Sequence, residues 1–356
     1  MATFVDLISL RRLTPDDAND APSSDSIPST WAFESCEKPK KMGSVTNIAY
    51  GGCALAMSLN AAYQTLQSEA PQKVIYSLVA HYLGPCTTDE CLRFKVSTIR
   101  ETRTFSTRQV LASQKQRDGS YRDCFAATLD FIAPVGHRPD HSILTYTLPP
   151  PTKYTHHSQL VDFADVLDGR VKSGELSQDG YDLFMYVFGL WREYLTLKVV
   201  PESVLAQNSY GILKKTVTSQ DHLHITEKWH ADWFRSIVPL SGRPAKGDAL
   251  PLPDELVHVC LIAFVLDSIL SFSPLSFSHR FNSDAASSSS LDLALRFFGE
   301  KHDMNQWHLR ETKTVQSDVG RSYGEAKLWS ESGQLIAHMS QQCILRPHPK
   351  KDKSKL

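Results

Sequence analysis

The hydrophobic and polar positions of the chain form two long apolar segments, each followed by shorter runs in which apolar and polar residues alternate. The more apolar segment covers residues 256–270, and Asp267 is the only charged residue between Glu255 and Arg280. The eleven residues before Asp267 are uncharged and would cover every face of a helix. This pattern predicts a helix buried in a protein core. The segment is too short, and too soon interrupted by a carboxylate, to cross a membrane.

The carboxylate of Asp267 requires an explanation. A buried carboxylate is costly unless it has partners, so this residue is a candidate for a functional site. The structural alternative is an aspartate at a helix end that meets solvent or caps the next turn. The segment alone favours neither interpretation.

The first apolar segment covers residues 50–63 and opens with Tyr50, Gly51 and Gly52. Its Ala, Leu and Met residues favour a helix. Four runs follow each apolar segment, and their Val, Thr, Phe and Tyr content with partial alternation predicts β-strands. The predicted strands are 75–83, 94–100, 104–113 and 124–132 after the first segment, and 290–298, 307–315, 322–330 and 335–346 after the second.

The remaining segments are less regular. Residues 4–13 predict a short opening element, and a loop rich in Asp, Ser and Pro follows it. Residues 181–200 and 224–239, which contain three tryptophans, are predicted to be strands. Three consecutive prolines at 149–151 begin a linker. We therefore expect an α+β chain with a first domain at 1–150, a linker at 151–180, a second domain at 181–348 and a tail at 349–356.

The two apolar segments are followed by the same order of elements, which predicts an internal repeat of about the size of a small domain. A constant offset of 213 residues aligns three pairs of positions: Ser77 with Ser290, Arg108 with Arg321, and Phe131 with Ile344. The helices could be offset by one turn more or less, because loops need not match in length. The alternative is a coincidental similarity between two α+β segments.

The composition excludes several classes of protein. Hydrophobic residues make up 41% and charged residues 22%, which is typical of a globular protein, and the net charge of −1 gives no reason to expect a nucleic acid or an anionic membrane as a partner. The seven cysteines are scattered without a CxxC motif, which indicates free thiols in a reducing compartment. The pairs His156–His157 and His222–His224 have no carboxylate or cysteine companion at ligand spacing, so no metal site is expected.

The two ends of the sequence carry different signals. Asp6 is too early for the apolar region of a secretory signal, so no export is expected. The chain finishes with Ser354, Lys355 and Leu356, the tripeptide that the peroxisomal import receptor reads. The alternative is a charged tail that ends this way by accident. We expect the protein to be peroxisomal, with the import receptor as a partner.

Several segments resemble the type II acyl-CoA thioesterases. In the first half these are Tyr50-Gly51-Gly52 with the apolar helix, residues 77–85 (SLVAHYLGP) and residues 103–110 (RTFSTRQV). In the second half they are Asp267, residues 290–292 (SLD) and residues 333–346 with Gln341. The resemblance implies a double hotdog, in which each half has a long helix wrapped by an antiparallel sheet.

The resemblance also implies a catalytic set of Asp267, Ser290 and Gln341. Ser289 is the alternative to Ser290 if the register slips by one residue. Subtracting 213 from the three positions gives Ala54, Ser77 and Thr128, so we expect one site per chain, in the second half. This chain has Leu293 where the family usually has His, and Arg296 where it usually has Trp. These departures concern the shape and polarity of the acyl pocket.

Thioester hydrolysis explains why these residue types would be needed. Asp267 would take a proton from the attacking water, and Ser290 and Gln341 would hold that water on it. Gly51 and Gly52 would let the thioester carbonyl approach backbone N–H groups, or else they form only a tight turn before the helix. Coenzyme A is a good leaving group, so neither a cofactor nor a covalent nucleophile is needed, and a Gly-x-Ser-x-Gly motif is absent.

Two arginines are candidates for binding the phosphates of coenzyme A. They are Arg108 and Arg321, although solvated arginines at strand ends are commoner than phosphate-binding ones.

Three functions compete with acyl-CoA hydrolysis. A related hydratase would need a His five residues after the Asp, where this chain has Phe272. A thioesterase that releases or transforms a specialised acyl product is the second candidate, and a non-catalytic acyl-CoA-binding module is the third. Two packed hotdogs per chain are also compatible with a homo-oligomer.

Overall fold

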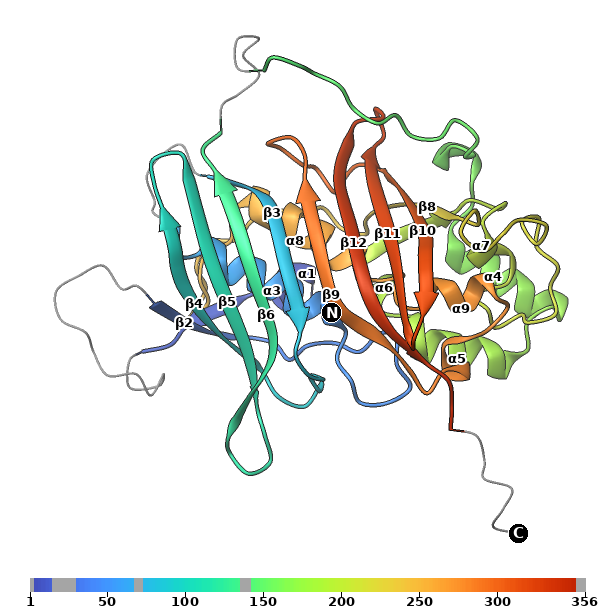
Figure 1. Ribbon diagram of the computed structural model, residues 1–356, viewed down its shortest axis with the longest axis horizontal. Coiled ribbons are helices and arrows are strands. Elements are labelled where there is room, and N and C mark those ends of the chain that lie inside the picture. The colour runs from blue at the N-terminus through green and yellow to red at the C-terminus, as the bar shows by residue number, and fades with distance from the viewer. Residues whose placement is uncertain (1–2, 15–29, 67–72, 135–141, 350–356) are drawn as a thin grey trace.

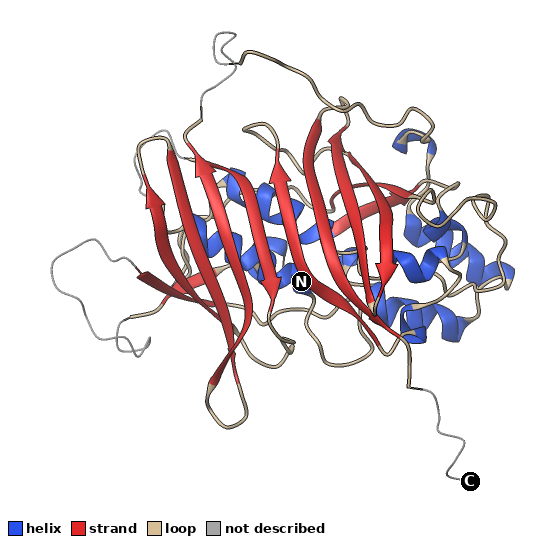
Figure 2. Ribbon diagram, viewed as in Figure 1, coloured by secondary structure: helices blue, strands red, loops and turns tan. Residues whose placement is uncertain are grey.

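In the described part of the chain, twelve strands form one antiparallel sheet. The computed structural model describes residues 3–14, 30–66, 73–134 and 142–349. The strand order is β1-β2-β4-β5-β6-β3-β9-β12-β11-β10-β8-β7, so the two halves of the chain meet where β3 pairs with β9. The central helices α3 and α8 lie behind this sheet, on one face of it (Figures 1 and 2).

Each half contributes six strands and one long helix. The N-terminal half consists of α1 (Phe4–Leu7), β1 (Leu10–Arg12), β2 (Thr30–Ser35), α3 (Gly51–Tyr63), β3 (Val74–Tyr82), β4 (Leu92–Glu101), β5 (Phe105–Lys115) and β6 (Tyr121–Ile132). The C-terminal half has α6 (Trp191–Tyr194), β7 (Leu195–Val199), β8 (His230–Ser236), α8 (Asp254–Leu266), β9 (Ser287–Phe297), β10 (His308–Asp318), β11 (Arg321–Ser330) and β12 (Leu335–Arg346). The shorter helices α4 (Phe163–Ser173), α5 (Gln178–Phe188), α7 (Val204–Gln207) and α9 (Ser273–Phe277) gather beside the C-terminal half (Figure 1). The eight strands predicted after the apolar segments are confirmed to within a few residues.

The two central helices pack against each other and run in opposite directions. Every residue from 52 to 62 of α3 and from 256 to 266 of α8 is buried, as expected for helices that are apolar on all faces. The hydroxyl of Tyr50 donates a hydrogen bond to the carbonyl of Phe264, and the Cys260 thiol lies 3.4 Å from the carbonyl of Ala56. The C-terminal end of α8 therefore meets the N-terminal end of α3.

Bulges occur at matching places in the two halves, and they define which residues are equivalent. The ladders skip Ile99 and Val315 (315 − 99 = 216), Tyr76 and Leu291 (291 − 76 = 215), and Cys124 and Ile336 (336 − 124 = 212). A bulge changes the twist and the pairing of its strand, so three matched bulges identify the repeat independently of side chains. The predicted repeat is confirmed, whereas its constant offset of 213 is wrong.

The corrected register changes the equivalent positions. Ser290 matches Ile75 rather than Ser77, Gln341 matches Leu129 rather than Thr128, Arg108 matches Gly324 rather than Arg321, and Phe131 matches Cys343 rather than Ile344. The error has a physical cause, because loops of different length change the offset from strand to strand. For Gln341 the error is one residue, which turns the matched side chain to the opposite face of the sheet. Thr128 is exposed, whereas Leu129 and Gln341 are buried.

The equivalent residues of the two central helices, α3 and α8, are related by a different offset from those of the strands. Each central helix has 13 residues, and the residues that end them are Gln64 and Asp267 (267 − 64 = 203). The next residues, Thr65 and Ser268, both donate a hydroxyl hydrogen bond of 2.7 Å to the carbonyl three positions earlier. The equivalent of Asp267 is therefore Gln64, and the match with Ala54 is wrong.

The segment 181–200 is mainly helical, which corrects the predicted strand. It contains most of α5, all of α6 and only the short strand β7. Its aromatic content suggested a strand, but the buried Phe184, Val187 and Phe188 have the spacing of one helix face. In the segment 224–239 only β8 is a strand. The expected linker at 151–180 includes α4, whose Phe163 is fully buried.

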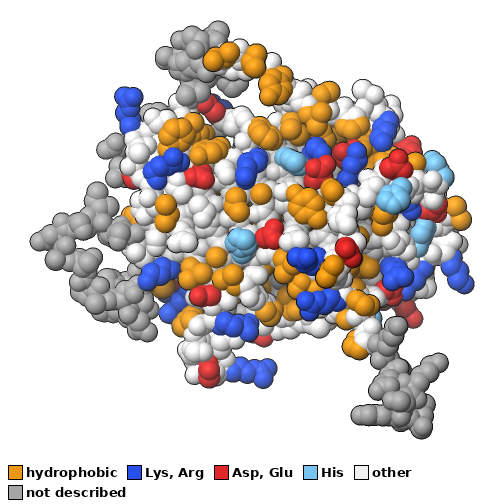
Figure 3. Space-filling view, viewed as in Figure 1, with side chains coloured by type: hydrophobic (Ala, Val, Ile, Leu, Met, Phe, Trp, Pro, Cys, Tyr) orange, Lys and Arg blue, Asp and Glu red, His pale blue; other side chains and the backbone are white. Residues whose placement is uncertain are grey.

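The outer face of the sheet has a mixed surface. Figure 3 shows cationic and anionic side chains interspersed with hydrophobic ones on this face, without a broad area of one charge among the residues drawn in colour. Val79 and Tyr323 are examples of its exposed apolar side chains. In the described part of the chain, no helix has both the length and the apolarity needed to cross a membrane.

The register generates a direct prediction about stability. Leu129→Ala should lower the free energy of unfolding by about 2–5 kcal/mol, because it removes a fully buried side chain. Thr128→Ala, one position earlier and exposed, should change it by less than about 0.5 kcal/mol. Urea denaturation of both variants measures the difference, and the opposite ranking would contradict the register.

Candidate active site

Asp267 ends helix α8 and its side chain is buried. Its backbone still has helical angles, and the residue is 4% exposed. The carboxylate lies between strands of the sheet and the first turn of α3, because α8 and α3 run in opposite directions. The interpretation of Asp267 as a solvent-facing helix end is therefore wrong.

Three side chains donate hydrogen bonds to one oxygen of this carboxylate. The Oδ1 atom of Asp267 lies 2.5 Å from Nε2 of Gln341, 3.1 Å from the hydroxyl of Tyr82 and 3.5 Å from the hydroxyl of Ser290. Gln341 is fully buried on β12, and Ser290 lies on the neighbouring strand β9. The structure thus brings together the three residues of the expected catalytic set. Ser290 faces the carboxylate, whereas Ser289 is exposed.

The other carboxylate oxygen lies beside the start of α3. A Cβ atom added to Gly51 would lie 3.0 Å from Oδ2 of Asp267 and 2.7 Å from the ring of Tyr82, so a larger residue would require a rearrangement. A Cβ atom on Gly52 would clash with the ring of Tyr50. Both glycines therefore permit a close approach. The first backbone N–H groups of a helix also point outward and carry a partial positive charge.

The surroundings of Asp267 set its protonation near neutral pH. Burial raises the pKa of this carboxyl group from 3.8 to about 7. Hydrogen bonds from Gln341, Tyr82, Ser290 and the Gly52 backbone N–H oppose this rise. A carboxylate with a pKa near 7 can act as a general base at neutral pH.

Tyr82 is a site residue that the sequence did not identify. It comes from β3 of the N-terminal half, so the site is built from both halves. Burial and the nearby Asp267 raise the pKa of Tyr82 well above its usual value, so its hydroxyl stays protonated and remains a donor. Tyr82 lies within residues 77–85, which carry part of the family resemblance, but nothing in that segment singled it out.

The two candidate phosphate-binding arginines have different surroundings. Arg108 is buried at the other end of α3, where it donates hydrogen bonds to the hydroxyl and carbonyl of Thr65 and pairs with Glu101 at 2.5 Å. Its guanidinium is already engaged by these partners. Arg321 is exposed at the start of β11, three residues from Gly324, which pairs with Gln341.

The two departures from the family pattern lie on opposite faces of the sheet. Leu293 pairs with Gln341 and is buried on the side of the central helices. Arg296 is exposed on the outer face and contacts the carbonyl of Leu78. Leu293 therefore affects the interior of the site, whereas Arg296 does not enter it.

The equivalent end of α3 lacks the acid of the second half. Gln64, Ile75 and Leu129 occupy the positions that match Asp267, Ser290 and Gln341. The side chain of Gln64 donates to the carbonyl of Pro251, 2.7 Å away. The expectation of an incomplete site in the first half stands, although the residues that occupy it differ from those predicted.

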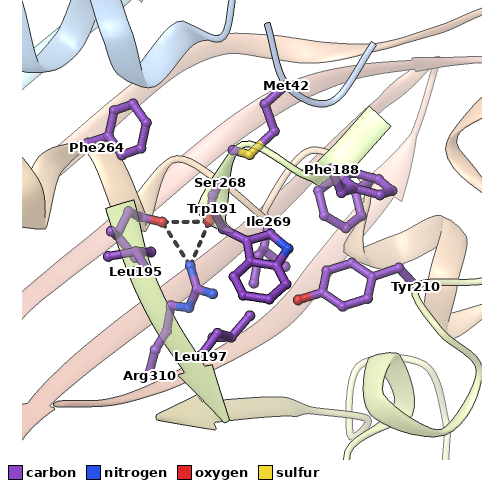
Figure 4. Close-up of a pocket in the computed structure, with 12 residues that line it drawn as sticks. Met42, Phe188, Trp191, Leu195, Leu197, Tyr210, Phe264, Ser268, Ile269 and Arg310 are labelled. Carbon is purple, nitrogen blue, oxygen red and sulfur yellow. Dashed lines mark hydrogen bonds between the residues drawn. The ribbon is translucent and has the colours of Figure 1, made fainter. Parts of the chain in front are cut away.

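An apolar cavity lies beside the end of α8 (Figure 4). It has about 440 Å³ of space between its walls, part of it open to solvent. Its wall includes Val265 of α8 and Ser268, which lie before and after Asp267 in sequence, but Asp267 itself does not line it. Arg310 enters the cavity wall from β10 and hydrogen-bonds to the end of α8 (Figure 4).

One group of side chains outside this site could hold a metal ion. Ring nitrogens of His156 and His157 and a carboxylate oxygen of Glu331 lie within 4.8 Å of one another. The expectation that these histidines lack a carboxylate companion is therefore wrong. Folding brings Glu331 to them from the β11–β12 turn. The 2.7 Å hydrogen bond between His157 and Glu331 accounts for the group without an ion.

The raised pKa predicts how stability depends on pH. Folded Asp267 keeps its proton up to about pH 7, whereas the unfolded residue releases it near 3.8. The folded state therefore binds more protons between these values, and this group's contribution to stability is lost as the pH rises through that window. Asp267→Asn should gain up to about 4 kcal/mol relative to the wild type between pH 4 and pH 8.

Chemical denaturation at both pH values measures this change. Asp292→Asn, on the same strand as Ser290, is the control and should follow the wild type. Parallel pH profiles for the wild type and Asp267→Asn would contradict the raised pKa.

Two family models match the chain. The acyl-CoA thioesterase N-terminal domain matches residues 38–132, and the acyl-CoA thioesterase C-terminal domain matches residues 227–345. Together they cover most of both halves of the sheet. No match was found among curated proteins.

Solved structures of thioesterases have the same fold. The acyl-CoA thioesterase II TesB2 from Mycobacterium marinum superposes with a TM-score of 0.63 at 17% identity, covering 98% of this chain and 99% of that one. The tesB protein of Mycobacterium avium subs paratuberculosis gives a TM-score of 0.58 at 16% identity, covering 91% and 96%. A putative thioesterase II from Thermobifida fusca gives 0.56 at 14% identity, covering 93% and 96%. From the two family models and this shared double hotdog fold, we conclude that the chain belongs to the acyl-CoA thioesterase family.

Proposed function

We propose that the protein hydrolyses acyl-CoA thioesters, with Asp267 as the general base that activates water. One observation carries the proposal. The buried carboxylate of Asp267 has one oxygen held by three donors and the other turned toward the glycine-rich start of a helix. Membership of the acyl-CoA thioesterase family supports the choice of substrate class.

The two carboxylate oxygens have different tasks in this mechanism. Gln341, Tyr82 and Ser290 all donate to Oδ1, so they hold the carboxylate in place. We assign to Oδ2, which lies beside Gly51, the acceptance of a proton from the attacking water molecule. A base with a pKa near 7 is ionised at neutral or slightly alkaline pH and still has a useful driving force for proton transfer.

The start of α3 would stabilise the negative charge that develops on the thioester oxygen. Backbone N–H groups at the start of a helix lie at its positive end, although here the Gly52 N–H already donates to Asp267 and the Cys53 N–H to the carbonyl of Tyr50. Such donors lower the energy of a tetrahedral intermediate when they are already aimed at the oxygen. Gly51 lets Tyr82 and Oδ2 of Asp267 pack against this first turn, because a Cβ atom there would meet both. The thiolate of coenzyme A then leaves without a strong acid.

The surroundings of Asp267 argue against hydration of a double bond. The residue five positions later, Phe272, is buried against the ring of Phe188 at 4.4 Å and lines the apolar cavity. It offers no group for proton transfer. The buried Leu293 next to Gln341 makes the interior of the site less polar than a histidine would.

A hydrolysis assay tests the proposal. Purified protein is incubated with acyl-CoAs of graded chain length, and the release of free coenzyme A thiol is followed. Asp267→Asn should lower kcat at least about 100-fold while the protein stays folded, because the base is lost. Gln341→Leu should also lower kcat, since it removes the shortest hydrogen bond to the carboxylate.

Asp292→Asn is the matched control, because it removes a neighbouring carboxylate that does not contact Asp267. It should keep wild-type turnover. In the wild type, kcat/KM should rise with pH through about 7, as the carboxylate of Asp267 ionises. Undiminished hydrolysis by Asp267→Asn would remove the assigned base, and tight binding of acyl-CoA without turnover would identify a binding module.

We also propose delivery to the peroxisome, and the terminal Ser354, Lys355 and Leu356 support it. These residues lie outside the described part of the chain. Deletion of the tripeptide from a fluorescently tagged protein should move the signal from peroxisomes to the cytosol. Replacement of Lys353, which lies just before the signal, is the control. Continued import of the truncated protein would contradict the proposal.

A further inference from the structure

Arg310 binds the turn of the chain that carries Asp267. Its Nη1 atom donates to the carbonyl of Val265 at 2.8 Å and to the hydroxyl of Ser268 at 2.7 Å. Ser268 itself donates to the same carbonyl, so the three groups form a closed triangle (Figure 4). A cation at the C-terminal end of a helix is favourable, because the backbone dipoles leave that end partly negative. Arg310 thus binds a backbone carbonyl before Asp267 and a side-chain hydroxyl after it.

A second charged residue holds Arg310 in this position. Nε and Nη2 of Arg310 donate to the two oxygens of Asp232 on β8, at 3.0 Å and 2.5 Å. The Asp232 side chain is fully buried, and that of Arg310 is 4% exposed. The nearby Arg310 and the hydrogen bond from His230 hold the pKa of Asp232 at about 2. A buried ion pair of this kind stabilises a fold little more than a well-packed apolar pair does, so its presence invites a functional explanation.

The N-terminal half provides an internal comparison. Asp232 pairs with Arg310 in the β8–β10 ladder, and the equivalent pair in the β2–β4 ladder is Phe33 with Phe94 (310 − 94 = 216). Both phenylalanines are almost completely buried. The same fold is therefore built without an ion pair at this place.

The end of α3 is held by an arginine from a different strand. Arg108 of β5 donates to the hydroxyl of Thr65 at 2.8 Å, and Thr65 is the equivalent of Ser268. Both helix ends are thus bound by a buried arginine with an acidic partner, Glu101 in the first half and Asp232 in the second. What differs is the strand that supplies the arginine.

The change of strand leaves room beside Gln341. The position that matches Arg108 is Gly324, and Gly324 pairs directly with Gln341. A Cβ atom there would lie 2.8 Å from the carbonyl of Lys313 and 3.3 Å from the side chain of Leu270. An arginine at this position would crowd the residue that binds Asp267. In the C-terminal half the arginine enters one strand further from the centre of the sheet, on β10.

We propose that Arg310, held by Asp232, is a positioning residue for Asp267. It fixes the last turn of α8 so that the carboxylate stays against Gln341 and the start of α3, and it places a cation at the negative end of that helix. The inference rests on the proposed function, in which Asp267 is the base. Arg108 has the same structural task at the end of α3 that carries no acid.

Removal of the cation should raise the pKa of Asp267 further, because the helix end then loses its neutralising charge. Several other titratable groups face this region, and they are unchanged in the test: Tyr50 and Cys53 at the start of α3, Tyr82 of β3, Cys343 of β12, Tyr210 after α7, and His230 of β8. The rise of kcat/KM with pH, which reports the ionisation of Asp267 and is called the pH limb below, should therefore move to higher pH when Arg310 is replaced.

Arg310→Met and Arg108→Met are the matched test and control. Each removes a buried arginine from the end of a central helix and leaves its acidic partner behind. We expect Arg310→Met to lower kcat at least tenfold with less than a threefold change in KM, and to shift the pH limb upward. Arg108→Met should keep kcat within about threefold and leave the pH limb in place. Arg310→Lys should recover part of the lost kcat, because an ammonium group can still donate to Val265 and Ser268.

A double variant keeps the test decisive if Arg310→Met fails to fold. Asp232→Leu with Arg310→Met removes both charges, as the Phe33–Phe94 pair does naturally, so it should fold as the wild type does. It should nevertheless show the loss of kcat and the shifted limb. A folded double variant with wild-type kcat and an unchanged limb would overturn the inference.

A measurement without substrate separates this inference from the proposed function. The carboxyl carbon signal of Asp267 in NMR, identified by its loss in Asp267→Asn, reports the titration directly. Its midpoint should move upward in Arg310→Met and stay in place in Arg108→Met. If the wild type hydrolyses no acyl-CoA, the proposed function fails and this titration still tests the positioning. If the wild type is active and both arginine variants behave alike, only the positioning is overturned.

Discussion

The contact between the end of α8 and the start of α3 is the constraint on which the site depends. Two apolar helices run in opposite directions under one sheet, so the negative end of α8 meets the positive end of α3. Asp267 lies at this junction, and its carboxylate is buried between the two helix ends and the sheet. Burial makes its proton affinity high, while the hydrogen bonds around it keep the ionised form accessible. Any change that separates the two helices would alter both effects.

The sequence predicted the strands well and their register poorly, for a physical reason. Alternation and β-propensity are local, so the strands after each apolar helix could be found directly. The relative register of the two halves depends on loop lengths and bulges, which differ by a few residues, and a one-residue error reverses the face of every side chain. The segment 181–200 is mainly helical although a strand is predicted for it, because Phe184, Val187 and Phe188 have the spacing of one buried helix face.

The residues of the candidate site also differ in whether the sequence could identify them. Asp267 could be found because a charge inside an apolar helix stands out, and Ser290 and Gln341 followed from the family resemblance. Tyr82 could not be found, since its contact with Asp267 joins residues 185 positions apart. Arg108 was a candidate for binding phosphate, but the structure buries it against Thr65. The sequence of a strand does not show whether its arginine is buried or which groups it contacts. Nothing in the sequence singled out Arg310. Its role is indicated only by comparing the two folded halves, where the Phe33–Phe94 pair occupies the place of Asp232 and Arg310.

The pairing of β3 with β9 has an evolutionary consequence. It joins two copies of one architecture into a continuous sheet, as two identical subunits would be joined across a twofold axis. In a dimer of identical subunits, the two places where the end of one central helix meets the start of the other would have the same residues, because every substitution would appear in both subunits. In a single chain the two junctions can differ, and here Gln64, Ile75 and Leu129 occupy the positions that match Asp267, Ser290 and Gln341. In the proposed mechanism, the N-terminal half supplies Gly51, Gly52 and Tyr82 to the site of the C-terminal half.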